Sequence, residues 1–350
     1  MEVYAPVPIS QEFVDQLRVM PKAEIHVHLE GAIDAETIYA MAKRNQVNLP
    51  ASSLDEWKSF YEFRDFNHFI QVYITATECM KTPDDYVLMI EQFLKNQAEQ
   101  NTRYSEVFVS MSLHSKKLPD EELLNALETG IKSGEAKYNS RMKIIADISR
   151  EDPASQTKVL GLALRGQEKG IVVGLNLGGI EPGNPPENFI ETYREAKRQG
   201  LRVVAHAGEA DGAKSIWGAI DELHVDRIGH GIRALEDAAL VEELRQRQIP
   251  IEVSPQSNYC LGIVGKNEPH PIRQLIDAGL FCTLNSDDPA MFSTNLVNEY
   301  VTLAAQGFSW EELWQLNLNT IGATFLEESE KAVYRSEWQA FNQSNLEAFP

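Results

Sequence analysis

Eight short apolar runs alternate with segments of helical periodicity along the chain, and this alternation limits the possible fold more than any other feature. Apolar runs of this length, bounded by polar residues, are typical of buried strands. Strands that are separated by helical crossovers pair in parallel. The eight predicted strands span residues 23–29, 103–110, 142–148, 171–177, 201–205, 227–230, 249–253 and 280–285.

The number of predicted strands favours a closed (β/α)8 TIM barrel over an open doubly wound sheet. No Gly-x-Gly-x-x-Gly sequence follows the first predicted strand, as a dinucleotide-binding sheet of the open class would require. The chain has 350 residues, 43% of them hydrophobic, and no Pro-, Gly- or Ser-rich linker divides it. We therefore expect one barrel domain over residues 1–350, with its active site at the carboxyl ends of the strands.

An aromatic-rich segment at about residues 52–80 follows the first predicted strand. Its rings recur at helical spacing, so it fits two helices that pack their apolar faces against the barrel. Because it follows a strand end that carries candidate site residues, it equally fits a helical lid over an aromatic ligand. The residues alone leave both interpretations open.

Charge and cysteine content narrow the range of partners. The net charge is −20, from 32 Lys and Arg against 52 Asp and Glu. Nucleic acid and anionic membranes would be repelled, so we expect neither as a partner.

Three widely spaced cysteines form no disulfide framework or metal-binding pair, which favours a reducing cytoplasm. We find no signal peptide and no apolar run long enough to span a membrane.

Four of the eight histidines lie at the ends of predicted strands. His26 and His28 are two residues apart, so on a strand their side chains point to the same face. His206 ends another strand and Asp287 follows the last one. Three imidazoles and a carboxylate suit Zn²⁺, and an open position for water would make such a site catalytic. The remaining histidines, interpreted as surface or packing residues, are His68, His114, His224 and His270.

Further reactive residues occupy the same kind of position. Glu209 follows His206 by three residues and is a candidate proton carrier. His230 stands between two glycines, which leave its imidazole accessible to a ligand. Asp287 and Asp288 are adjacent and face different ways, so we expect Asp287 to face the metal and Asp288 the substrate.

Taken together, these motifs resemble the adenosine deaminase family of zinc-dependent purine deaminases. The resemblance spans about residues 20 to 330. It implies a (β/α)8 barrel with helices inserted after the first strand that help to cover the pocket, which favours the lid interpretation of residues 52–80. The matching motifs, in the order of the family, lie at residues 21–31, 177–179, 206–209, 227–231, 254–258 and 284–289.

The resemblance implies one zinc ion per chain and a role for each matching residue. Glu209 matches the acid that protonates the ring nitrogen N1. His230 matches the histidine that helps to activate and orient the attacking hydroxide. The residues that match the zinc ligands are His26, His28, His206 and Asp287, of which Asp287 also belongs to the catalytic set.

The resemblance also implies a purine-binding set of His28, Glu30, Gly179 and Asp288. Asp288 matches the residue that contacts N7, and Gly179 matches the glycine whose backbone amide contacts N3. Typical members carry Asp at the position of Glu30, where it contacts the ribose 5′-hydroxyl. Glu at this position resembles relatives that act on free adenine or on 5′-substituted nucleosides such as aminodeoxyfutalosine, whereas Gly178-Gly179 keeps the nucleoside pattern.

We therefore expect hydrolytic deamination of adenosine or deoxyadenosine to inosine or deoxyinosine plus ammonia. A 5′-modified adenosine or free adenine is the alternative substrate. A two-metal barrel hydrolase is a competing class, but it needs a carboxylated lysine at a strand end, and no Lys ends a predicted strand. A barrel that binds purines without turnover is the other class, although every proton-transfer and ligand position is filled.

Overall fold

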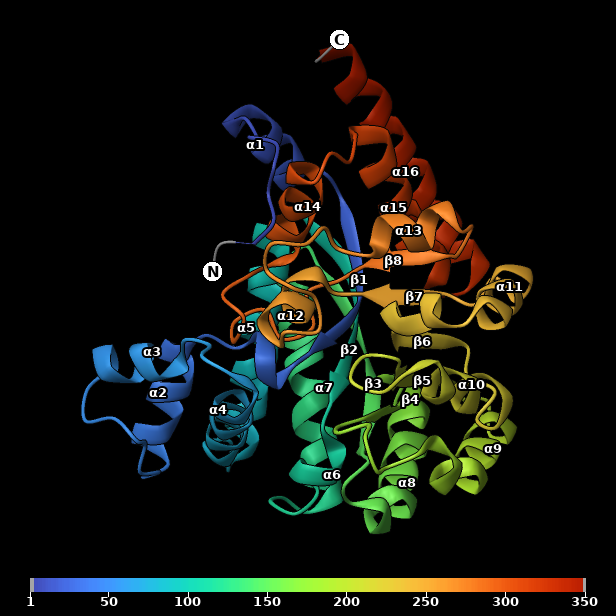
Figure 1. The fold of residues 1–350 in the computed structure, drawn as a ribbon. Coiled ribbons are helices and arrows are strands. Elements are labelled where there is room, and N and C mark those ends of the chain that lie inside the picture. Colours follow the sequence, from blue (N-terminus) through green and yellow to red (C-terminus); the bar gives the residue numbers. More distant parts are fainter. Residues whose placement is uncertain (1–2, 349–350) are drawn as a thin grey trace.

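The computed structural model describes residues 3–348 and contains the predicted (β/α)8 barrel (Figure 1). Eight parallel strands follow one another around the barrel in chain order. The first and last strands meet where Val27 bridges Asp287, and the His28 N–H donates to the Asp287 carbonyl at 2.8 Å. The strands, which confirm all eight predictions, are β1 (Lys22–His28), β2 (Thr102–Val109), β3 (Arg141–Ser149), β4 (Val172–Gly178), β5 (Arg202–Ala207), β6 (Arg227–His230), β7 (Ile251–Val253) and β8 (Cys282–Leu284).

Helices surround the barrel, and several of them begin at a side-chain cap. Asp34, for example, accepts the Thr37 N–H at 2.7 Å and caps the start of α2. The helices are α1 (Gln11–Val19), α2 (Ala35–Arg44), α3 (Leu54–Tyr61), α4 (Phe66–Glu78), α5 (Pro83–Glu99), α6 (Met111–His114), α7 (Asp120–Lys137), α8 (Gln156–Glu168), α9 (Ile190–Arg198), α10 (Ala213–Asp221), α11 (Ala238–Arg247), α12 (Pro255–Cys260), α13 (Ile272–Asp277), α14 (Leu296–Ala305), α15 (Trp310–Ala323) and α16 (Glu328–Ala348).

The aromatic segment after β1 forms two helices with different surroundings. Helix α3 packs beside α2, where the Trp57 indole N–H donates to the Ala35 carbonyl at 2.9 Å. Helix α4 lies between this pair and the barrel (Figure 1), and its residues Phe69 and Tyr73 line the main cavity. Packing therefore explains α3, whereas α4 forms part of the cavity wall.

Inside the barrel, aromatic and aliphatic side chains pack directly against the candidate metal ligands. Phe108, Ile145 and Val204 form a small buried cluster of their own. The Phe108 ring lies 4.8 Å from the His26 ring and 5.0 Å from the His28 ring, centroid to centroid. This packing restricts the rotamers of both imidazoles.

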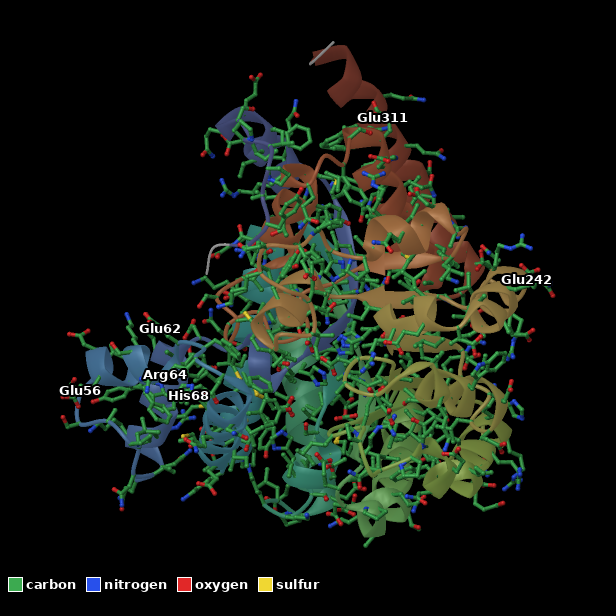
Figure 2. All side chains as sticks on the ribbon, viewed as in Figure 1. Glu56, Glu62, Arg64, His68, Glu242 and Glu311 are labelled. Atoms are coloured by element: carbon green, nitrogen blue, oxygen red, sulfur yellow. The ribbon has the colours of Figure 1, made fainter. Side chains whose placement is uncertain are left out.

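The acidic residues lie mainly on the outer helices. Figure 2 shows Glu56, Glu242 and Glu311 at the periphery of the fold, and all three are exposed. Among the described residues, no helix is both long enough and apolar enough to cross a membrane.

Candidate metal centre and purine pocket

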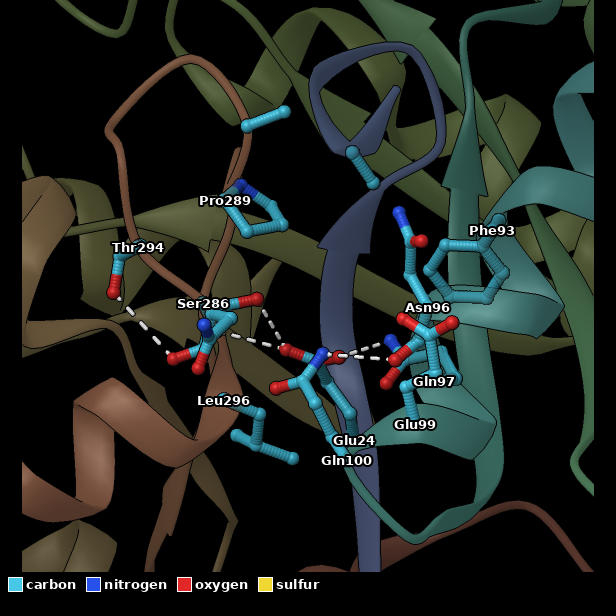
Figure 3. Close-up of a pocket in the computed structure, with 13 residues that line it drawn as sticks. Glu24, Phe93, Asn96, Gln97, Glu99, Gln100, Ser286, Pro289, Thr294 and Leu296 are labelled. Carbon is cyan, nitrogen blue, oxygen red and sulfur yellow. Dashed lines mark hydrogen bonds between the residues drawn. The ribbon is translucent and has the colours of Figure 1, made fainter. Parts of the chain in front are cut away.

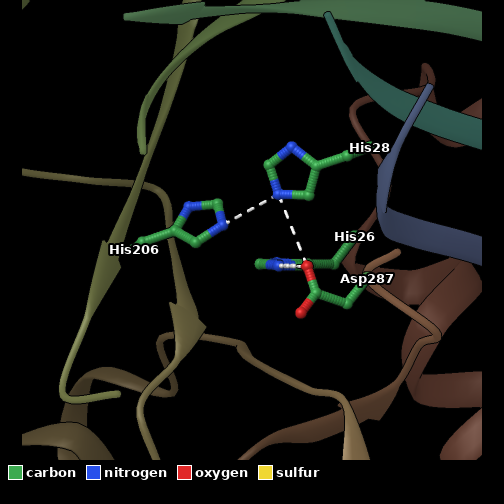
Figure 4. A group of neighbouring side chains, drawn as sticks. All are labelled: His26, His28, His206 and Asp287. Carbon is green, nitrogen blue, oxygen red and sulfur yellow. Dashed lines mark hydrogen bonds and ion pairs between the residues drawn. The ribbon is translucent and has the colours of Figure 1, made fainter. Parts of the chain in front are cut away.

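Four predicted ligands converge at the carboxyl ends of three strands (Figure 4). His26 and His28 lie on β1, His206 lies on β5, and Asp287 follows β8. Their ligand atoms all lie within 4.8 Å of one another. The Nε2 atoms of His28 and His206 are 3.1 Å apart, and Asp287 Oδ1 lies 3.4 Å from His28 Nε2 and 3.6 Å from His26 Nε2.

The chemistry of this cluster fits a single Zn²⁺ ion. His26 Nε2 is buried without a hydrogen-bond partner, and two imidazole nitrogens that face each other share at most one proton. Burial lowers the pKa of His26, but the carboxylates Asp287 and Glu252 outweigh it and raise this pKa to about 9. The cluster thus attracts positive charge, and three nitrogens with one carboxylate oxygen are the donors that zinc prefers.

A buried carboxylate on β7 orients His26. Glu252 Oε2 lies 2.7 Å from His26 Nδ1, and neither side chain is exposed. The Nδ1–H therefore donates to Glu252, and the Nε2 lone pair is left for the metal. Arg227 forms an ion pair with Glu252 and another with Glu106. In the sequence, Glu252 is a charged residue inside the apolar run at residues 249–253. It belongs to none of the motifs from which the site residues were predicted.

Two polar residues orient His206 in a similar way. Asn176 Oδ1 lies 3.3 Å from His206 Nδ1, and Asn176 Nδ2 donates to Asp147 Oδ1 at 2.7 Å. Asn176 Nδ2 also lies 3.1 Å from His206 Nδ1, so the Nδ1 side of the ring faces the Asn176 amide and Nε2 faces the cluster. Burial raises the pKa of Asp147 well above its usual range.

Glu209 and His230 face each other beside the ligand cluster, with Glu209 Oε1 3.6 Å from His230 Nε2. Burial, followed by the charges of Asp287 and Glu181, raises the pKa of Glu209 well above its usual range. Burial lowers the pKa of His230 to about 3, so this imidazole is neutral at pH 7. The pair can therefore hold and move a proton, with Glu209 as the carrier.

Glu181, which the sequence analysis did not single out, fixes the loop that carries Glu209. Its Oε2 accepts the backbone N–H groups of Glu209, Ala210 and Asp211 at 3.1, 2.9 and 2.7 Å. Its Oε1 accepts the Ser215 hydroxyl at 3.0 Å. Four hydrogen bonds to one buried carboxylate hold the Glu209 backbone in place.

Asp288 and Gly179 also line the cavity, as a purine-binding set requires. Asp288 Oδ1 is buried and has no hydrogen-bond partner. Burial, followed by the adjacent Asp287 charge, raises the pKa of Asp288 well above its usual range. Gly179 has φ +91°, a backbone conformation that favours glycine, and a Cβ there would require the Glu151 carboxylate, 2.1 Å away, to move.

The main cavity has a volume of about 560 Å³ and is markedly acidic. No Lys or Arg occurs among the described residues that line it. Apolar side chains from α4 and from the loops after β4 and β7 form much of its wall. Its acidic lining residues are Asp147, Glu151, Glu181, Glu209, Asp287 and Asp288.

A second cavity, of about 260 Å³, is lined by residues of β1, α5 and the loop after β8, among them Glu24, Gln97 and Ser286 (Figure 3). Glu24 accepts hydrogen bonds there from the backbone and hydroxyl of Ser286 and from the Gln97 amide. None of the predicted site residues lines this cavity. Its polar contacts hold the loop after β8 against β1.

Glu30 is fully buried beside the main cavity, and its partners include a histidine that the sequence analysis interpreted as a surface or packing residue. Glu30 Oε1 accepts the Ser110 N–H at 2.8 Å and the His114 Nε2–H at 2.7 Å, and the Tyr73 hydroxyl lies 3.3 Å from Oε2. These hydrogen bonds lower the pKa of Glu30, although burial alone would raise it. Tyr73 and Ser110, rather than Glu30, form the cavity surface.

Comparison with known proteins adds family information to this geometry. Residues 21–340 match the family described as adenosine deaminase. The adenine deaminase of Ralstonia nicotianae is 33% identical over 332 residues, which cover 93% of this chain and 96% of the relative. The crystal structure of adenine deaminase from Arthrobacter aurescens has a TM-score of 0.87 and 33% identity, covering 93% and 99% of the two chains. An amidohydrolase structure from Burkholderia ambifaria, with bound Zn, has a TM-score of 0.90 and 25% identity, covering 99% and 97%.

Proposed function

Because the chain belongs to the adenosine deaminase family, we propose that this hydrolytic purine deaminase acts on free adenine and releases hypoxanthine and ammonia. The observation that carries this choice is the 33% identity to adenine deaminases along nearly the full length of both chains. Adenosine, the main substrate expected from the sequence, has less support. Free adenine was one of the two alternatives suggested by Glu30, the other being a 5′-modified adenosine.

The enzyme uses one zinc ion, for which we propose His26, His28, His206 and Asp287 as ligands. When bound, zinc supplies the Lewis acidity that makes water a nucleophile at neutral pH. His230 is neutral and its ring lies 4.7 Å from the His26 ring and 5.1 Å from the His206 ring, so it can accept a hydrogen bond from the attacking water and orient it. Glu209 delivers a proton to N1, which relieves the charge that develops as C6 is attacked.

The other nitrogens of the purine ring can each form a hydrogen bond with a group of the cavity. N7 is a hydrogen-bond acceptor, and we propose that Asp288, whose Oδ1 has no partner in the protein and whose pKa is raised by burial, holds a proton and donates it to N7 in a hydrogen bond. The backbone N–H of Gly179 would donate to N3, and His28, one of the residues that would hold the zinc ion, would lie beside the ring. Because these contacts involve only atoms of the purine ring, they would be the same for a free base and for a nucleoside.

The absence of Lys and Arg among the described residues that line the cavity argues against nucleotides as substrates. A phosphate group needs cationic side chains or a helix N-terminus, and the described lining contains six acids and no Lys or Arg. A 5′-modified adenine nucleoside is the second candidate, because about 560 Å³ is more space than a bare purine fills.

We further propose that residues 1–350 act as one barrel domain, since α1 packs against α14 and α16 packs against α15. All three cysteines are buried and free, which supports a reducing, cytoplasmic location.

A substrate panel tests the proposal. Ammonia release would be measured with adenine, adenosine, deoxyadenosine, 5′-methylthioadenosine, aminodeoxyfutalosine and AMP. We expect the highest kcat/KM for adenine and no turnover of AMP. A higher kcat/KM for any nucleoside than for adenine would refute the choice of the free base.

A further inference from the structure

The Tyr73 hydroxyl on α4 contacts two polar groups at the barrel mouth. The Tyr73 hydroxyl lies 2.8 Å from Ser110 Oγ, at the end of β2, and 3.3 Å from Glu30 Oε2. The other α4 residues that line the cavity, Phe69, Ile70 and Ile74, are apolar. Tyr73 and Ser110 therefore form a polar site in an apolar part of the wall.

The buried chain Tyr86–His114–Glu30 fixes this polar site from behind. Tyr86 OH lies 2.9 Å from His114 Nδ1, and His114 Nε2 lies 2.7 Å from Glu30 Oε1. None of these three side chains is exposed. A neutral imidazole has one donor and one acceptor, so the Tyr86 O–H donates to Nδ1 and Nε2–H donates to Glu30.

The direction of each further hydrogen bond follows from the carboxylate. An ionised carboxylate only accepts, so the Tyr73 O–H donates to Glu30. The Tyr73 hydroxyl has a single proton, so the Ser110 O–H must donate to the Tyr73 oxygen. The lone pairs of Ser110 Oγ then remain as a hydrogen-bond acceptor at the cavity surface, where Ser110 is a lining residue.

The position of this acceptor matches one edge of the proposed substrate. In the proposed binding mode, C6 faces the metal cluster, and N1, N3 and N7 face Glu209, Gly179 and Asp288. The edge that carries N9 is left for the wall formed by Tyr73 and Ser110. A free purine base bears an N–H donor on this edge, whereas a nucleoside bears carbon.

We propose that Glu30, held by His114, orders the Tyr73 and Ser110 hydroxyls so that the cavity accepts a hydrogen bond from N9–H of a free base. This inference rests on the proposed function and deepens it. Glu30 is then a specificity-determining residue that acts through other side chains, and His114 is a positioning residue. Asp at position 30 would be shorter by one carbon–carbon bond, about 1.5 Å, and would lose the His114 or the Ser110 contact.

The test compares adenine with 9-methyladenine, which lacks the N9 donor but is nearly the same size. We expect the wild-type enzyme to prefer adenine in kcat/KM by about tenfold, which corresponds to about 1.4 kcal/mol, the value of one hydrogen bond. Ser110→Ala removes the acceptor, and Glu30→Gln reverses the order of the hydroxyls by placing an amide donor opposite Tyr73. Both variants should lose most of this preference, chiefly because their KM for adenine is higher.

Conservative and control variants complete the experiment. His114→Gln keeps an N–H donor and should retain the preference, whereas His114→Leu should lose it. Glu299→Gln, another buried carboxylate that is remote from this chain of hydrogen bonds, should retain it. If the wild-type enzyme deaminates adenine but treats 9-methyladenine equally, or if Ser110→Ala keeps the preference, the inference is wrong and the proposed function stands. If the wild-type enzyme does not deaminate adenine, the proposed function itself is wrong.

Discussion

Replacing Glu252 with glutamine should weaken zinc binding although Glu252 is not itself a ligand. In the structure Glu252 accepts from His26 Nδ1 at 2.7 Å and pairs with Arg227, and neither His26 nor Glu252 is exposed. A glutamine side chain has one acceptor oxygen and one NH2 group. Both of its neighbours are donors, so the amide must leave one of them facing another donor.

The size of the effect follows from the position of Glu252 behind a ligand. Residues that orient a metal-bound histidine typically contribute about 10- to 100-fold in metal affinity, or about 1.4 to 2.7 kcal/mol. Arg227 keeps its ion pair with Glu106 but loses the charge of Glu252. Loss of one partner from a buried ion pair costs up to about 3–5 kcal/mol, so the stability of the zinc-free protein should also fall.

The assay is competition for zinc between the purified protein and a chromophoric chelator, with chemical denaturation of the zinc-free protein measured in parallel. Glu299→Gln is the matched control, because Glu299 is equally buried but contacts Thr294 and Gln256 rather than a ligand. We expect the control to bind zinc like the wild type. A zinc affinity of Glu252→Gln within about threefold of the wild type would refute the role of Glu252.

Three further predictions concern the other groups of the site and the core. Glu209→Gln should retain zinc but lose about 10²- to 10⁴-fold in kcat, and a loss below about tenfold would exclude Glu209 as the proton donor. His206→Ala should lose zinc and activity while its circular dichroism stays that of a barrel; full zinc content would disprove its role as a ligand. Burial raises the pKa of Glu299 from 4.5 to about 8, so the wild type should lose stability as pH rises from 4.5 through 8, because the unfolded chain releases this proton first. Glu299→Gln should reduce the difference in Tm between pH 5 and pH 8.5, and an unchanged difference would contradict this explanation.

The sequence predicted those parts of the structure that depend on local pattern. The strands could be found because each is a short apolar run, and His26 and His28 could be placed on one face because strand side chains alternate. The convergence of His206 and Asp287 with them follows from the barrel rule that strand ends meet at one rim.

Contacts that depend on the register of distant strands could not be predicted in this way. Glu252 is 226 residues from His26, and nothing near either residue indicates the pairing. His114 was interpreted as a surface or packing residue because it ends no predicted strand; its contact with Glu30 arises only when β1 and β2 lie side by side. The partners of such residues can be identified only from the folded barrel, which brings them together.

The most direct test of the account is the stoichiometry of adenine hydrolysis by protein with a measured zinc content. Adenine loss, hypoxanthine formation and ammonia release would be followed together while zinc is added to the zinc-free protein. We expect one hypoxanthine and one ammonia for each adenine consumed, with activity rising in proportion to zinc up to one ion per chain. Protein with one zinc per chain that leaves adenine unchanged, or activity that requires a second zinc, would contradict the account.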